Sequence, residues 1–134
     1  CREREVSALR KAVREMREKM RANLDKTGDG RFDLKQGHGG IADIEFMVQY
    51  SVLRWAHEHP DLADWTDNIR LLETLDRLDL MPGNTARELT VAYKDLRAAY
   101  HRSALQDQPT TIPNDSLVDQ RARVRALWRE LMED

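Results

Sequence analysis

Residues 32–46 read FDLKQGHGGIADIEF and lead directly into the most apolar segment of the chain, MVQYSVLRW at 47–55. Apolar and aromatic residues cover almost the whole circumference of a helix drawn from Ile41 to just before Pro60, which is typical of a buried central helix. The glycines at 37, 39 and 40 allow a tight turn immediately before it. We therefore predict a buried helix that follows a glycine-rich turn.

A second helix is predicted from about Glu3 to Leu24. It carries a narrow apolar stripe, and nearly all of its other residues are Arg, Lys or Glu. The members of the predicted stripe are Val6, Leu9, Val13, Met16 and Met20. Such a charged amphipathic helix either packs against a neighbouring domain or supplies one edge of this one.

Three more helices follow the central one. The first opens after Thr66 as N-cap, the next at Thr85 with a capping box, and the last near Ser116 with Asp119 at capping-box spacing. The extended candidate Arg31–Lys35 is too short to form a strand without a partner. We predict an all-α fold, a helical bundle of about five helices. Residues 1–134 form a single helical domain, with the charged helix at 1–24 and the bundle at 32–134.

Composition excludes several classes of protein. The chain has 134 residues, and 22 basic residues against 24 acidic ones give a net charge of −2, which argues against a nucleic-acid binder. No apolar run approaches the roughly 20 residues of a membrane span, and no secretory signal opens the chain. The single cysteine, Cys1, excludes an internal disulfide. We expect a cytoplasmic protein. We also expect this chain to be a piece of a longer one, because it starts without methionine.

The segment 25–36, DKTGDGRFDLKQ, imitates a calcium-binding EF-hand loop. Oxygen-bearing side chains stand at loop positions 1, 3, 5 and 9, with glycine at position 6. Position 12, however, is Gln36 instead of the bidentate glutamate, and three basic residues lower the local negative charge. The sequence favours a polar turn over a calcium site.

Two interpretations of the glycine-rich turn remain open. In the first the glycines are structural and let the buried helix approach another backbone closely. In the second, uncovered amides at the helix start and Lys35 bind an anion such as phosphate. Asp43 and Glu45 would repel a bare phosphate, so that Asp43 either pairs with Lys35 as a structural clasp or binds a magnesium ion that bridges to the phosphate.

The run FDLKQGHGGIADIEFMVQYSVLRWAHEHPDL resembles the segment that follows the nucleotidyltransferase core in the family of bacterial bifunctional glutamine synthetase adenylyltransferases. The resemblance continues through WTDNIRLLETLDRLDLMP and AYKDLRAAYHRSALQ and covers about Met16 to the C-terminus. A related version of the motif occurs in the other half of these enzymes and in the uridylyltransferase that modifies the PII protein. Ala42 and the continuation VLRWAHEHP indicate the C-terminal, adenylylating half.

The resemblance implies a helical domain packed against a nucleotidyltransferase domain that transfers AMP from ATP to a tyrosine of glutamine synthetase. ATP and Mg²⁺ would be bound mainly by that domain, and the enzyme would be regulated by glutamine and PII. We assign no catalytic and no metal-binding residue in this chain. The motif positions that we hypothesise to face the catalytic cleft as cofactor-binding residues are Lys35, Gly37, Gly39, Gly40, Asp43 and Glu45.

The alternative function is that of a non-catalytic interaction module. The glycine turn would then be purely structural, and exposed helix faces would dock PII, glutamine synthetase or the other half of the enzyme.

Overall fold

Five α-helices and one two-stranded sheet form the part of the chain that the computed structural model describes, residues 2–25, 30–64, 66–105 and 110–133. The elements are α1 (Arg2–Leu24), β1 (Arg31–Asp33), α2 (Ile41–Trp55), the 3₁₀ helix η1 (Pro60–Asp64), α3 (Asn68–Arg77), α4 (Thr85–Leu105), β2 (Thr111–Pro113) and α5 (Val118–Met132). The predicted all-α bundle is confirmed. Within these residues, none of the helices is long and apolar enough to cross a membrane.

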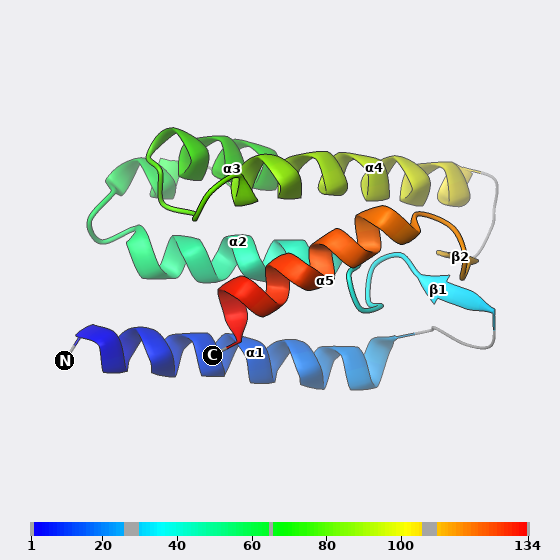
Figure 1. Cartoon of the computed structure of the whole chain (residues 1–134), viewed down its shortest axis with the longest axis horizontal. Helices are drawn as coiled ribbons and strands as arrows, with labels where there is room; N and C mark the ends of the chain where they lie inside the picture. Colours follow the sequence, from blue (N-terminus) through cyan, green and yellow to red (C-terminus); the bar gives the residue numbers. More distant parts are fainter. Residues whose placement is uncertain (1, 26–29, 65, 106–109, 134) are drawn as a thin grey trace.

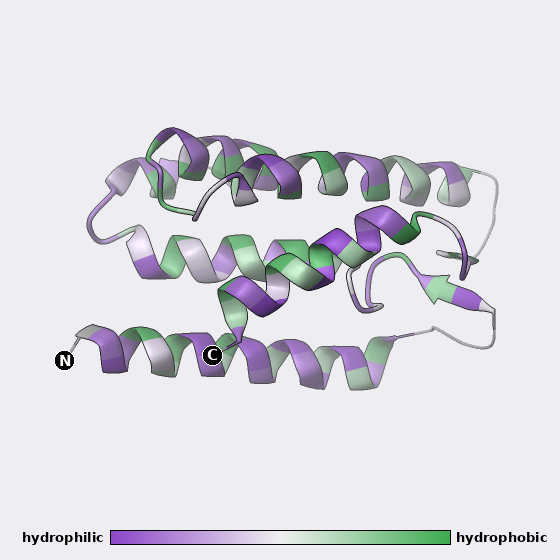
Figure 2. Cartoon of the chain, in the orientation of Figure 1, coloured by the Kyte–Doolittle hydropathy of each residue, from purple (hydrophilic) through white to green (hydrophobic). Residues whose placement is uncertain are grey.

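Helix α2 is the centre of the bundle, as its apolar sequence predicts. It packs against α1, α3, α4 and α5, with α1 along one side, α3 and α4 along the other, and α5 crossing obliquely (Figure 1). Its apolar surface contrasts with the mostly hydrophilic α1 in Figure 2. Ile44, Met47 and Val48 are completely buried, whereas Leu53 is 53% exposed near the end of the helix.

Helix α1 lies against α2 and α5, so that it forms one edge of this bundle. Val13 joins the common core as predicted. Met16 does not, because it is 63% exposed, and the buried positions one and two turns beyond Val13 are instead Arg17 and Arg21. The predicted apolar stripe is therefore wrong at Met16, whereas Met20 is half-buried.

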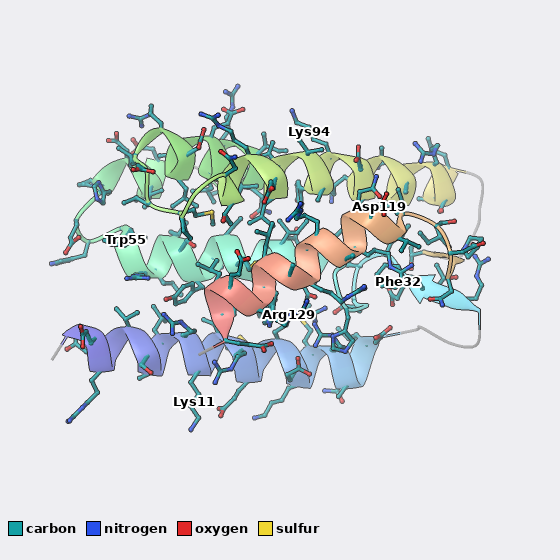
Figure 3. The ribbon with its side chains drawn as sticks, viewed as in Figure 1. Lys11, Phe32, Trp55, Lys94, Asp119 and Arg129 are labelled. Atoms are coloured by element: carbon teal, nitrogen blue, oxygen red, sulfur yellow. The ribbon has the colours of Figure 1, made fainter. Side chains whose placement is uncertain are left out.

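The extended segment at residues 31–33 does find a partner. β1 pairs with β2 antiparallel, with Phe32 opposite Ile112. The guanidinium of Arg121 on α5 lies 3.8 Å from the centre of the Phe32 ring, which ties this sheet to α5. Figure 3 shows Phe32 at the end of the bundle where the sheet lies.

The predicted helix caps are wrong in detail. The N-cap of α3 is Asp67, not Thr66, and its carboxylate accepts hydrogen bonds from the N–H groups of Ile69 and Arg70. Helix α5 begins at Val118, after Leu117 in the left-handed region at φ 54°, without a side-chain cap. The predicted capping box of Ser116 and Asp119 therefore does not form.

Candidate functional site

The glycine-rich turn is held by hydrogen bonds within the protein. The carboxylate of Asp33, at the end of β1, accepts the N–H groups of Lys35 and Gln36 at 2.9 and 3.0 Å. At the start of α2, the N–H groups of Ile41 and Ala42 donate back to the carbonyls of residues 34 and 35. The amides engaged in this way belong to Lys35, Gln36, Gly37, Gly39, Gly40, Ile41 and Ala42. The hypothesis that the turn leaves its amides uncovered is therefore wrong at these positions.

The three glycines of the motif let backbones approach closely, as the structural interpretation predicts. Gly39 has φ +82°, and a Cβ there would overlap the carbonyl oxygen of Arg121 on α5. A Cβ at Gly40 would lie 2.7 Å from the carbonyl oxygen of Leu34, and one at Gly37 would collide with β1. A side chain at any of these positions would push the turn away from its neighbours.

Asp43 lies in a buried network that joins α1 to the start of α2. Its Oδ1 accepts hydrogen bonds from Nε of Arg17 and Nη2 of Arg21, both at 2.6 Å, and its Oδ2 accepts the N–H of Gly39 at 2.8 Å. Arg17 is completely buried and also donates to the side-chain and backbone oxygens of Gln36, at 3.1 and 2.7 Å. Charge-assisted bonds of this kind are the strong ones in proteins. We call these three ionised residues, Arg17, Asp43 and Arg21, the clasp.

The clasp differs from the one that the sequence suggests. Lys35 is exposed and forms no ion pair with any residue that the structure describes. Both oxygens of Asp43 are occupied by protein donors, so that the geometry supports the structural alternative for Asp43, with two arginines in place of the lysine. Arg17 and Arg21 were missed because arginine on a charged helix normally faces water. The sequence does indicate that they are buried, because they follow Val13 at four-residue intervals and so lie on the same face of the helix.

Glu45 faces a different part of the bundle from Asp43. Successive helical residues are rotated by about 100°, so that positions two apart point to opposite sides. The Oε2 of Glu45 accepts hydrogen bonds from the Tyr93 hydroxyl at 3.3 Å and from Nδ2 of Asn68 at 3.4 Å, which links α2 to α4 and α3. The structure thus brings Asp43 and the glycines together, leaves Lys35 exposed beside them, and separates Glu45 from all of them.

The Tyr93 hydroxyl should make the free energy of unfolding depend on pH in the alkaline range. Burial raises the pKa of Tyr93 above its ordinary value, with the nearby charge of Glu45 adding to the effect and the hydrogen bond from Asn68 opposing it. Because the pKa of Tyr93 is higher in the folded state, the fold is fully stabilised while the hydroxyl is protonated in both states, below about pH 10. This contribution of Tyr93 to the free energy of unfolding is lost as the pH rises through the folded pKa. We expect the free energy of unfolding to fall more steeply above pH 10 in the wild type than in Tyr93→Phe, measured by urea denaturation from pH 8 to 11. Equal slopes would contradict this.

The remaining motif residues that the structure describes form no metal site. The segment proposed to imitate an EF-hand includes residues 26–29, which lie outside the described residues, as does Cys1. Of the rest, the carboxylate of Asp33 caps the turn and Oε1 of Gln36 accepts a hydrogen bond from Arg17. Among the described residues, no three His, Cys, Asp or Glu side chains lie close enough to bind a metal ion together.

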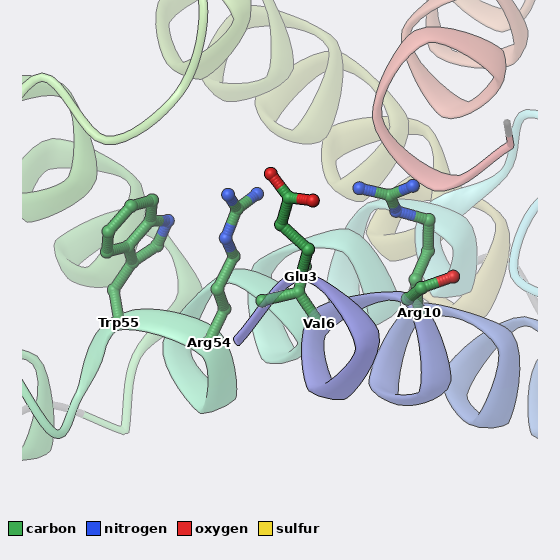
Figure 4. Close-up of a pocket in the computed structure, with 6 residues that line it drawn as sticks. Glu3, Val6, Arg10, Arg54 and Trp55 are labelled. Carbon is green, nitrogen blue, oxygen red and sulfur yellow. The ribbon is translucent and has the colours of Figure 1, made fainter. Parts of the chain in front are cut away.

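A separate pocket of about 360 Å³ lies between the start of α1 and the end of α2 (Figure 4). The guanidinium of Arg54 lies 4.6 Å from the centre of the Trp55 ring there. Glu3 and Arg10 enter the pocket from α1. It contains none of the predicted site residues, and we assign it no chemistry.

Comparison with known proteins agrees with the resemblance. The family model described as GlnD PII-uridylyltransferase matches residues 7–129. The bifunctional glutamine synthetase adenylyltransferase/adenylyl-removing enzymes of Shewanella loihica and Thioalkalivibrio sulfidiphilus are both 48% identical to the chain, over 132 and 134 residues. That of Nitrosococcus oceani is 47% identical over 133 residues. The matches cover 98–100% of this chain and 14% of each relative.

Proposed function

Because the chain belongs to the GlnD PII-uridylyltransferase family and matches bifunctional glutamine synthetase adenylyltransferases along its length, we propose that it is a helical domain of such an enzyme. In this proposal it adjoins the nucleotidyltransferase domain of the adenylylating half and supports the transfer of AMP from ATP to a tyrosine of glutamine synthetase. ATP and Mg²⁺ are bound mainly by that other domain, in the cytoplasm. The chain supplies no catalytic residue.

The observation that carries the proposal is the position of Lys35. It is the predicted site residue with an exposed cationic side chain that forms no ion pair with the described residues. It stands on a turn that the clasp and the close-packed glycines hold in place. A fixed turn presents such a charge at a defined point without a large loss of backbone entropy on binding. In the proposal the Lys35 ammonium approaches the phosphates of ATP in the adjoining domain, while Gly37, Gly39, Gly40 and Asp43 position it. Glu45 stabilises the bundle behind it.

The test is Lys35→Ala in the full-length parent enzyme. We expect kcat/KM for ATP to fall about 10²-fold, because a preorganised charge on the phosphates stabilises the transition state. Lys35→Arg should retain part of this activity. The matched control is Lys94→Ala, which removes another exposed lysine, on α4. Thermal unfolding should not change in any of the three variants.

A second candidate function is the interaction module that docks PII, glutamine synthetase or the other half of the enzyme. It is favoured by the engaged amides of the turn and by an open groove between α1, α2 and α3, whose apolar lining includes Met16, Phe46 and Val52. If Lys35→Ala leaves turnover unchanged at saturating effector, the phosphate role of Lys35 is refuted and the docking function replaces it.

A further inference from the structure

A small pocket lies where the second half of α1, the glycine-rich turn and the second half of α5 meet. Its volume is about 120 Å³, room for several water molecules and thus for one small ion. It is lined by Glu18, Arg21, His38, Asp43, Arg125, Trp128, Arg129 and Glu133. None of the three arginines is a predicted site residue, and Lys35 does not line the pocket.

Two of the three carboxylates in this pocket are already used. Glu18 pairs with Nη1 of Arg21, and Asp43 accepts bonds from Arg17, Arg21 and Gly39. They therefore do not neutralise the arginines of α5. The third carboxylate, Glu133, is exposed at the end of α5 and forms no ion pair within the described part of the chain.

The guanidinium groups, in contrast, have unused donors. The side chains of Arg125 and Arg129 form no hydrogen bond or ion pair with any described residue. The Nε of Arg21 is buried and also has no hydrogen-bond acceptor among these residues. This nitrogen is sealed from solvent by the surrounding side chains, so that an anion in the pocket does not reach it. Among the described residues, the guanidinium groups of Arg125 and Arg129 therefore use none of their donors.

Of the two α5 arginines that line the pocket, Arg125 is held in place by the fold. Arg125 and Arg129 stand one turn apart on α5, so that their side chains leave the same face of the helix. Cγ of Arg125 packs over Gly39, 3.1 Å from where a Cβ would lie. Burial lowers the pKa of Arg121, and the nearby charge of Arg125 adds to the effect. Figure 3 shows Arg129 on α5 near α1.

We infer that this pocket binds a small oxyanion, of the phosphate or carboxylate class, through the guanidinium groups of Arg125 and Arg129. Guanidinium groups offer paired N–H donors that match two oxygens of such an anion. His38, exposed on the turn and part of the lining, stands where it adds a further donor. The anion would join the turn and α5, two of the elements around the clasp.

The test is a titration of the 134-residue chain with inorganic phosphate at constant ionic strength, followed by the NMR signals of the arginine Nε–H groups. We expect saturable shifts at Arg125 and Arg129 that sodium chloride does not produce. In the variant Arg125→Gln/Arg129→Gln the affinity should fall at least about tenfold, because two charge-assisted contacts are lost. The matched control, Lys94→Gln/Arg102→Gln, removes two exposed cations on α4 and should bind phosphate like the wild type.

A parallel titration with acetate separates the two sources: saturation by acetate as well identifies a carboxylate site, and saturation by phosphate alone identifies a phosphate site. The single variant Arg129→Gln, at an exposed position, keeps the test valid if the double variant unfolds, and should weaken binding severalfold. The inference is overturned if neither anion gives a saturable shift, if the α5 variants bind as tightly as the wild type, or if the α4 control loses affinity equally.

Discussion

Replacement of Asp43 by alanine should lower the free energy of unfolding by about 3–5 kcal/mol, because it leaves a buried charge without a partner. Arg17 is completely buried and would keep only the oxygens of Gln36 as acceptors. Since domains of this size have a total stability of only about 5–15 kcal/mol, the variant should be close to unfolding at 37 °C. Urea denaturation followed by circular dichroism measures the loss.

The control for Asp43→Ala is Asp76→Ala, which breaks an ion pair with Arg87 on the surface, where the arginine side chain is 73% exposed. Its cost should stay below about 1 kcal/mol. A further variant, Arg17→Met combined with Asp43→Ala, should cost less than the sum of the two single changes, because it removes both charges together. Similar losses for Asp43→Ala and Asp76→Ala would show that the clasp contributes little.

Replacement of Gly39 by alanine should cost about 2–5 kcal/mol for a different reason, backbone strain combined with a collision. The positive φ disfavours any side chain, and the new Cβ would overlap the carbonyl oxygen of Arg121. The turn would have to move away from α5. Thermal or urea unfolding measures the effect.

Gly83→Ala separates the two contributions. Gly83 also has a positive φ, +55°, but a Cβ there meets nothing within 4 Å. Its replacement should cost only the strain of the left-handed conformation, about 1–2 kcal/mol. If both variants lose the same stability, the close approach between the turn and α5 does not matter and our account of the motif glycines is wrong.

The sequence predicts the architecture well because the strongest signal, the apolar circumference of α2, comes from burial itself. A helix that is apolar all round has to lie inside a bundle, and α2 does. The start of α2 at Ile41 also follows directly from the glycines before it. These predictions depend on long stretches of residues and survive small local errors.

The elements that sequence reasoning missed depend on contacts between distant segments. β2 at Thr111–Pro113 looks like a proline-containing loop, and only its pairing with β1, about 80 residues earlier, makes it a strand. The capping signals at Ser116 and Asp119 are short patterns that tertiary contacts override. A local window contains none of this information.

The candidate site shows the same limit. The sequence anticipates a structural clasp on Asp43, but it offers the neighbouring Lys35 as partner, because distance along the chain is all that it shows. The actual partners, Arg17 and Arg21, lie 26 and 22 residues away on α1. Similarly, Asp43 and Glu45 appear as a pair of carboxylates in the motif, yet the rotation of the helix sends them to opposite sides of α2.

The central claim is that this domain is an ordered support for AMP transfer and that the chemistry takes place in an adjoining domain. The most direct test is to assay the 134-residue chain and the full-length parent enzyme side by side for transfer of labelled AMP from ATP to glutamine synthetase, in the presence of Mg²⁺. We predict transfer by the full-length enzyme and none above background by the folded chain alone. Transfer by the chain alone would contradict the account, because it would require a catalytic set that we assign to another domain.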